Sequence, residues 1–114
     1  MSLAKRIADR QRAARKIIEV AEWGEDDTSP LIIHCGPMLA MEMEKIQRKH
    51  PNFFQSATIA GMVDLIILKA EDKDGEKVFS LEDKPVLMRE EFGVIARIAG
   101  EMISATSVED HEKN

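Results

Sequence analysis

The residues whose types could support catalysis or metal binding are few and scattered along the chain. The sequence holds one cysteine, Cys35, and three histidines, His34, His50 and His111. A nucleophilic thiol needs a base and a group that orients the base, and a metal site needs ligands at characteristic spacings. Neither pattern is present, so we expect Cys35 to be a small buried hydrophobic residue. The sequence therefore predicts no catalytic residues, no metal and no cofactor, and a protein that is not an enzyme.

One acidic stretch, Asp72–Gly75, has part of the pattern of a calcium-binding loop. In an EF-hand the glycine is the sixth loop position, and carboxylates occupy the first and the twelfth. Placing Gly75 at the sixth position puts Ala70 at the first and Leu81 at the twelfth, so both required carboxylates are missing. We interpret the stretch as an acidic turn in which Gly75 supplies a positive φ.

Charge is divided unevenly between the N-terminus and the remainder. Residues 1–16 contain six Lys or Arg and one Asp, which gives +5, and residues 17–114 contain ten against twenty Asp or Glu, which gives −10. The acidic body would repel a nucleic acid, so only the N-terminal arm could attract one. We favour a solvated helix face or a contact with an acidic second copy, and thus a homo-oligomer, with Arg10, Arg12 and Arg15 as candidate self-association residues.

Length and composition predict one globular domain. The chain has 114 residues, of which 44% are hydrophobic and 32% charged, as in ordinary globular proteins. We expect no membrane-spanning segment, because no apolar run reaches about 18 residues. No apolar stretch follows the charged N-terminus, so no signal peptide is expected. With a single cysteine there is no disulfide framework, and these features together predict a cytoplasmic protein.

The N-terminal half is predicted to contain a β-hairpin. Residues 1–15 form a basic arm or helix, because good helix formers dominate residues 3–14. Residues 16–23 and 31–35 are rich in β-branched residues and flank an acidic turn, which favours two paired strands. Residues 16–23 also fit an extension of the first helix, and that reading leaves an all-α fold as the alternative.

Helices are predicted for the remainder of the domain, at residues 37–49, 53–70, 84–88 and 90–104. Pro37 suits a first helical turn, and Ser80 with Asp83 has the pattern of a helix start. Asp64 interrupts the apolar stretch 53–70, and we expect it to face solvent or to cap a neighbouring turn. The fold class predicted is α+β, a mostly helical single domain at residues 16–104 followed by a disordered polar tail at residues 105–114.

Two stretches of the sequence are similar to one family. A run from Val20 to Gly24 precedes the strand-like segment 30–34, and the stretch 72–88 keeps acidic, glycine, phenylalanine and leucine positions in a single register. The chain resembles, over residues 16–104, the small tail assembly chaperones of long-tailed phages and prophages. The residues that carry the resemblance are Trp23, Gly24, Asp72, Asp74, Gly75, Phe79, Asp83 and Leu87.

The resemblance implies a non-enzymatic role in virion morphogenesis. Such chaperones bind the tape measure protein, and tail tube subunits as a second partner, keep an aggregation-prone partner in solution, self-associate, and are absent from the mature virion. The residues that carry the resemblance are expected to have structural roles. Gly75 permits a turn, Phe79 anchors that turn on the core, and Asp83 caps the helix that carries Leu87. The alternative is a small phage or prophage regulatory protein that binds nucleic acid through its basic arm.

Overall fold

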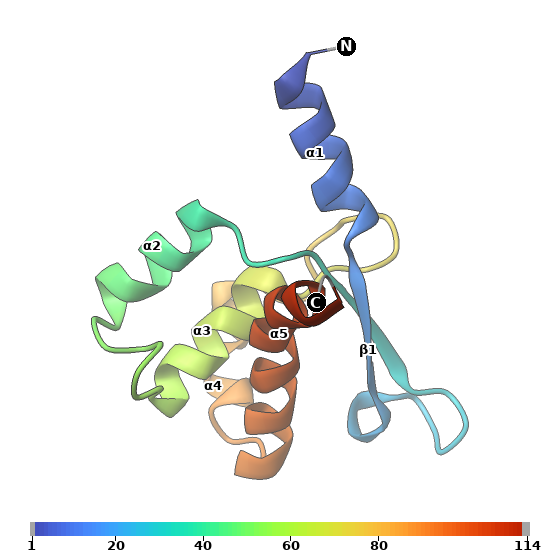
Figure 1. Cartoon of the computed structure of the whole chain (residues 1–114). Helices are drawn as coiled ribbons and strands as arrows, with labels where there is room; N and C mark the ends of the chain where they lie inside the picture. Colours follow the sequence, from blue (N-terminus) through green and yellow to red (C-terminus); the bar gives the residue numbers. More distant parts are fainter. Residues whose placement is uncertain (1, 113–114) are drawn as a thin grey trace.

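The computed structural model describes residues 2–112, with side chains for residues 2–104. In this part of the chain five α-helices accompany one two-stranded antiparallel sheet (Figure 1), which confirms the predicted α+β class and excludes the all-α alternative. The elements in chain order, with η for a 3₁₀ helix, are α1 Leu3–Ala13, β1 Lys16–Val20, η1 Ala21–Trp23, β2 Leu31–Cys35, α2 Ala40–Lys49, α3 Ile59–Lys69, η2 Leu81–Asp83, α4 Lys84–Leu87 and α5 Phe92–Glu112.

The hairpin formed by β1 and β2 covers one side of the core. Lys16 lies opposite Cys35 and Val20 opposite Leu31, so alternate residues of each strand face inward. The predicted first strand ends earlier than residue 23, because the chain turns into η1 and the Gly24 N–H donates to the carbonyl of Ala21 at 3.2 Å. The four buried hairpin residues are Ile18, Val20, Ile33 and Cys35.

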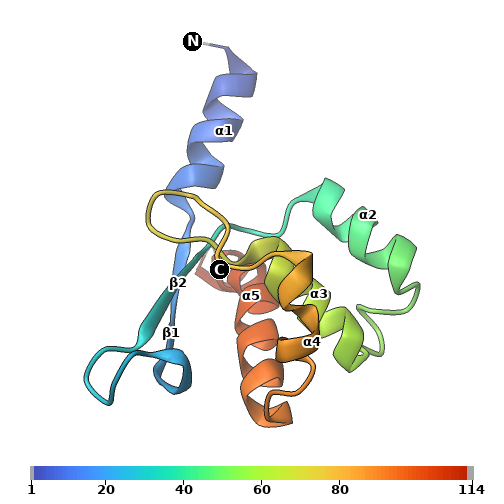
Figure 2. The ribbon, with the colours of Figure 1, turned by 180° about the vertical axis from the view of Figure 1, so that it is seen from behind.

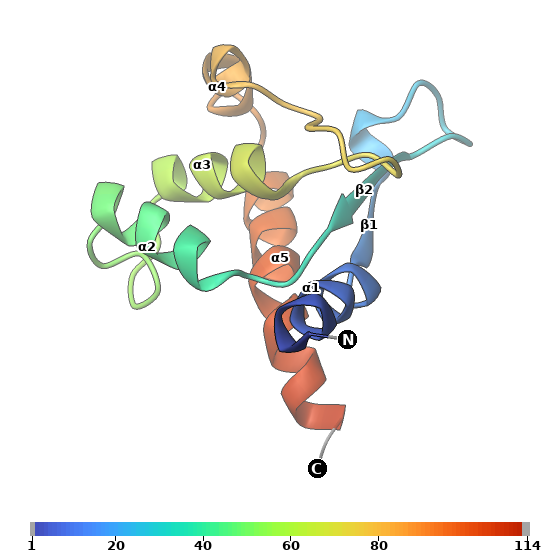
Figure 3. The same cartoon turned by 90° about the horizontal axis from the view of Figure 1, so that it is seen from above.

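The core lies where α3 and α5 pack against each other, with β1 against α5 and with α2 and α4 against α3. Figures 1 and 3 show the hairpin and α2 on opposite sides of the α3–α5 pair. Because α3 has neighbours on several sides, it is apolar around most of its circumference. Its contribution to the core is completed by buried residues of α5, which are Val94, Ile95, Ile98, Ala99 and Met102.

Helix α2 begins later than predicted. It starts at Ala40 rather than at residue 37, so Pro37 is not in its first turn. The Leu39 N–H donates to Oε1 of Glu42 at 2.9 Å, and the same Oε1 lies 2.6 Å from Nζ of Lys69 on α3. A local cap thus marks the start of α2, and Lys69 on α3 pairs with the capping carboxylate.

Helix α3 also begins later than predicted, at Ile59 instead of residue 53. Thr58 is the N-cap, and its Oγ1 accepts a hydrogen bond from the Gly61 N–H at 3.0 Å. Phe53 is buried beneath Gly61, where a β-carbon added to the glycine would lie 2.6 Å from the phenylalanine ring. The segment 50–56 turns back in this way to place Phe53 in the core.

Helix α5 begins at Phe92 and continues to Glu112, past its predicted end at residue 104. No proline or glycine interrupts residues 101–112, so nothing in the backbone chemistry ends the helix at residue 104. The tail predicted at residues 105–114 thus overlaps α5 up to Glu112. Residues 113–114, and the side chains from residue 105 onward, lie outside the described residues.

Helix α1 leads away from the body of the molecule (Figure 1). The Ser2 hydroxyl caps it by accepting from the Lys5 N–H at 3.2 Å, and none of its described residues is buried. The turn at residues 71–77 lies beside its base (Figure 2), where the Arg15 guanidinium donates to the Asp72 carbonyl at 2.8 Å.

Candidate binding groove

A groove of about 500 Å³ lies between the tip of the hairpin and α4. We call it the Trp groove, since the only tryptophan of the chain is in its wall. The lining comes from η1, the start of β2, the segment before η2, and α4 with the residues after it. Its residues are Trp23, Leu31, Phe79, Val86, Leu87, Arg89 and Glu90.

The two aromatic residues of the Trp groove hold each other in place. The rings of Trp23 and Phe79 meet edge to face, with centroids 5.6 Å apart and planes at 83°, an arrangement that aromatic pairs favour. The Trp23 indole N–H donates to the Glu90 carboxylate, which also accepts from the Glu91 N–H at 2.6 Å. These two hydrogen bonds hold the pKa of Glu90 below its ordinary value.

A bidentate ion pair anchors η1, and thereby Trp23, to α5. Both terminal nitrogens of Arg97 lie 2.9 Å from the carboxylate oxygens of Glu22. Hydrogen bonding from this guanidinium lowers the pKa of Glu22 to about 2. The planar, fork-shaped geometry fixes the direction of both side chains, so one wall of the groove has a defined position relative to the longest helix.

The other wall is built by η2 and α4. The Ser80 N–H donates to Oδ2 of Asp83 at 2.9 Å, and the Asp83 N–H donates to the Ser80 carbonyl at 3.0 Å. The predicted start signal at Ser80 and Asp83 is thus confirmed for η2, but the expectation that Asp83 caps the helix that carries Leu87 is wrong, because its side chain makes no capping bond to α4. This turn buries Leu87 and leaves Val86 72% exposed.

The remaining signature residues lie outside the groove or beside it. Gly75 has a φ of 85° in the turn 71–77, and Oδ1 of Asp72 accepts from the N–H groups of Asp74 and Glu76 at 2.8 and 3.0 Å. Gly24 adjoins Trp23, and its α-carbon packs against the backbone of Ser29. Of the eight residues that carry the resemblance, Trp23, Phe79 and Leu87 line the Trp groove.

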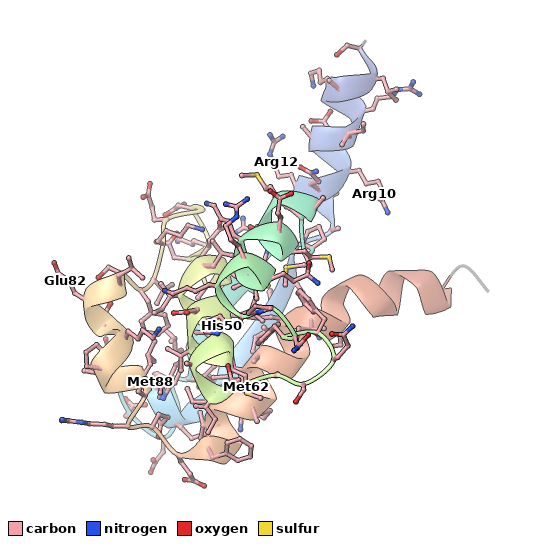
Figure 4. All side chains as sticks on the ribbon, turned by 90° about the vertical axis from the view of Figure 1, so that its left-hand side faces the viewer. Arg10, Arg12, His50, Met62, Glu82 and Met88 are labelled. Atoms are coloured by element: carbon pink, nitrogen blue, oxygen red, sulfur yellow. The ribbon has the colours of Figure 1, made fainter. Side chains whose placement is uncertain are left out.

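The three candidate arginines of the arm have different environments. Arg15 is tied to the body by its bond to the Asp72 carbonyl, and it also lies 3.7 Å from the Glu71 carboxylate. Arg12 lies 3.3 Å from the Asp9 carboxylate on the same helix. Figure 4 shows Arg10 and Arg12 on different sides of α1. Arg15 therefore has a structural role, and the arginines on α1 itself are the more exposed members of the set.

A buried charged cluster, missed in the sequence analysis, surrounds Asp64. Its side chain is 8% exposed, and its Oδ2 lies 2.7 Å from Nε2 of His50, which Figure 4 shows at the junction of α2 and α3. Its Oδ1 lies 2.9 Å from Nζ of Lys84. Burial acts to raise the pKa of Asp64, but these two partners outweigh burial and hold it below its ordinary value. The prediction that Asp64 faces solvent or caps a neighbouring turn is wrong, because the side chain is buried and pairs with side chains from the end of α2 and from α4.

The lowered pKa of Asp64 predicts a specific acid sensitivity. Its ionised form stabilises the fold above its unfolded-state pKa of about 4, and this contribution is lost as the pH falls through the lower folded-state value. We expect Asp64→Asn to cost about 1–3 kcal/mol at neutral pH. The difference from wild type in the free energy of unfolding should shrink between about pH 5 and pH 2. Urea denaturation at several pH values measures it.

The exposed Asp27 in the hairpin turn offers a control, since Asp27→Asn should leave the pH dependence unchanged. A difference between wild type and Asp64→Asn that stays constant down to pH 2 would contradict the assignment of Asp64 as an ionised buried partner.

The cysteine is placed where nucleophilic chemistry is disfavoured. Cys35 is buried, its thiol donates to the Gly36 carbonyl at 3.3 Å, and burial raises its pKa. A thiol in this state is a weak nucleophile at neutral pH. Within the described side chains, no group of three or more His, Cys, Asp or Glu could hold a metal ion. What the geometry offers is an apolar groove with an aromatic wall.

A search of protein-family models, of curated proteins and of solved structures gives no match to this chain. Among the described residues, none of the helices has the length and apolar character needed to cross a membrane.

Proposed function

We propose that this chain is a non-enzymatic tail assembly chaperone of a long-tailed phage or prophage. In this proposal the Trp groove holds an apolar helical segment of the tape measure protein. The observation that carries it is that Trp23, which is far in the sequence from Phe79 and Leu87, lines one groove with them that is open to solvent. Leu87 is buried and supports the groove from the core, whereas Trp23 and Phe79 are only partly buried and leave ring surface for a partner.

The chemistry of the groove suits an amphipathic helix. Aromatic and aliphatic side chains form its walls, and Arg89 and Glu90 supply polar groups at its rim. Such grooves receive the apolar face of a helix through side chains spaced at one helical turn. A volume of about 500 Å³ is within the usual range of ligand pockets. A partner segment held in this way keeps its apolar face covered in the host cytoplasm until the tail is assembled, and tail tube subunits are a second candidate partner.

Self-association is the second part of the proposal. Helix α1 points away from the body, and its Leu3 and Ile7, one turn apart, are both exposed. The arm is basic and the body acidic, so we propose that α1 of one copy contacts the body of the next. Because α1 and the surface it would contact are different parts of the molecule, this contact is head-to-tail and supports rings or open chains of copies.

Gel filtration with light scattering, on the chain co-expressed with a segment of a phage tape measure protein, tests the proposal. We expect co-elution, and we expect Val86→Asp to weaken it by about tenfold or more, because a carboxylate would enter an apolar contact. Val86 is 72% exposed, so the substitution should leave the fold intact. The control Ile59→Asp changes another exposed apolar residue, at the start of α3 and outside the groove, and should co-elute as wild type does.

The same measurement on the chain alone reports self-association. We expect a mass above 12.8 kDa that grows with concentration. A chain that stays at 12.8 kDa at all concentrations and does not co-elute with the tape measure segment would contradict both parts of the proposal. The next hypothesis to test would then be DNA binding through the basic arm, which should weaken as the salt concentration rises.

A further inference from the structure

A second pocket, of about 430 Å³, opens between α2, α3 and η2. We call it the lysine pocket, after Lys45, Lys49 and Lys77 in its lining. Its floor is apolar and includes Ile67 and Phe79, and Leu81 stands 70% exposed at its edge. Phe79 also lines the Trp groove, so the two cavities adjoin each other on either side of this ring.

The charge around the lysine pocket is opposite in sign to that of the whole chain. Three lysines and one aspartate line it, which gives +2 locally, whereas the chain carries −5. The aspartate is Asp64, whose carboxylate already has His50 and Lys84 at 2.7 and 2.9 Å. These two cations lie closest to the carboxylate, although its Oδ1 makes no hydrogen bond of good geometry, and neither Lys45 nor Lys77 is paired with it.

The lysines themselves are arranged to receive carboxylates. Lys45 and Lys49 lie one turn apart on α2, so both ammonium groups project along the same side of the helix. Among the described side chains, Lys45 has no ion-pair partner, and Lys49 reaches Asp64 only at 3.5 Å. Lys77 is held across the pocket by the Leu68 carbonyl at 2.6 Å and by Glu71 at 3.6 Å. The nearby Glu82 points away from the body (Figure 4).

We propose that the lysine pocket binds an acidic amphipathic helix of a partner protein. Aliphatic side chains of that helix would cover Ile67, Phe79 and Leu81, while carboxylates one turn apart would pair with Lys45 and Lys49. The apolar floor suits the aliphatic face of such a helix, and the positively charged rim suits its carboxylates. The inference does not rest on the proposed function, because the lysines that carry it lie outside the lining of the Trp groove, although the two cavities share Phe79.

The test uses a fluorescein-labelled synthetic helix of leucine and glutamate, about 18 residues or five turns long, and follows its anisotropy on titration with the full chain. We expect saturable binding that Lys45→Glu weakens about tenfold. Lys73→Glu is the matched control, since Lys73 is also exposed and has no ion-pair partner among the described side chains. It should change the affinity less than about twofold.

Two further measurements make the outcome decisive. Val86→Asp, which alters the Trp groove, should leave the affinity for the leucine–glutamate helix unchanged, so a failure here is distinguishable from a failure of the chaperone proposal. Equal binding of a leucine–lysine helix, or equal affinities of Lys45→Glu and wild type, would overturn the inference. Binding to anionic phospholipid vesicles that is stronger than binding to the peptide, and lost in Lys45→Glu, would also overturn it in favour of a membrane surface.

Discussion

Replacing Glu42 by alanine is expected to destabilise the chain by about 3–5 kcal/mol, because it leaves a buried ammonium without its counter-charge. Lys69 on α3 is 5% exposed, and its Nζ lies 2.6 Å from Oε1 of Glu42 and 2.9 Å from the Pro37 carbonyl. The same Oε1 accepts the Leu39 N–H at the start of α2. The substitution therefore removes an ion pair and a helix cap at once.

Urea denaturation followed by circular dichroism measures this effect, and the chain offers a close control. Glu44 lies on the same helix and pairs with Arg48 at 2.7 Å, but both side chains are exposed. Glu44→Ala should cost less than about 1 kcal/mol. Replacing both buried partners by apolar residues, as Glu42→Leu with Lys69→Met, should recover much of the lost stability. Equal costs for Glu42→Ala and Glu44→Ala would contradict the account of this pair.

Gly24→Ala is expected to destabilise the hairpin by about 3 kcal/mol, at the upper end of the range for overpacking. A β-carbon at this position would lie 2.1 Å from the Ser29 carbonyl oxygen and 2.8 Å from the Pro30 α-carbon. Both obstructing groups are backbone atoms of the hairpin turn, so they cannot rotate aside as a side chain can. The turn must open, and the adjacent Trp23 should become more exposed.

Thermal denaturation and the emission maximum of Trp23 measure the two consequences together. Gly100→Ala is the control, because Gly100 is exposed in α5 and a β-carbon there would have nothing within 4 Å. Alanine should stabilise that helix by about 0.5–1 kcal/mol. Unchanged stability and unchanged emission in Gly24→Ala would show that the hairpin turn does not pack as described.

Local sequence chemistry was enough to predict the hairpin, the acidic turn and the start of η2. The β-branched residues before Trp23 and after Pro30 favour strands, Gly75 provides the one positive φ among the described residues, and Ser80 with Asp83 forms the expected cap. The acidic turn and the start of η2 depend on residues within a few positions of one another. The hairpin pairs residues as far apart as Lys16 and Cys35, and its signal was the composition of each strand and of the turn between them.

The buried charges could not be predicted in the same way, whereas the starts of α2 and α3 had local capping signals in Glu42 and Thr58 that the prediction overlooked. Glu42 meets Lys69 across 27 positions, and His50 meets Asp64 across 14. An acidic residue inside an apolar helix was the visible signal for Asp64, but its partners come from α2 and α4. The Trp groove likewise exists only because the chain returns past the hairpin and places Phe79 against Trp23.

The proposed binding of an apolar helical tail-protein segment in the Trp groove can be observed directly. Trp23 is the only tryptophan in the chain, so its fluorescence during titration with the tape measure segment reports directly on the groove. We expect a saturable blue shift as the indole is covered, with an affinity about tenfold weaker in Val86→Asp and unchanged in Ile59→Asp. Binding that leaves the Trp23 emission unaltered, or that Val86→Asp does not weaken, would contradict it.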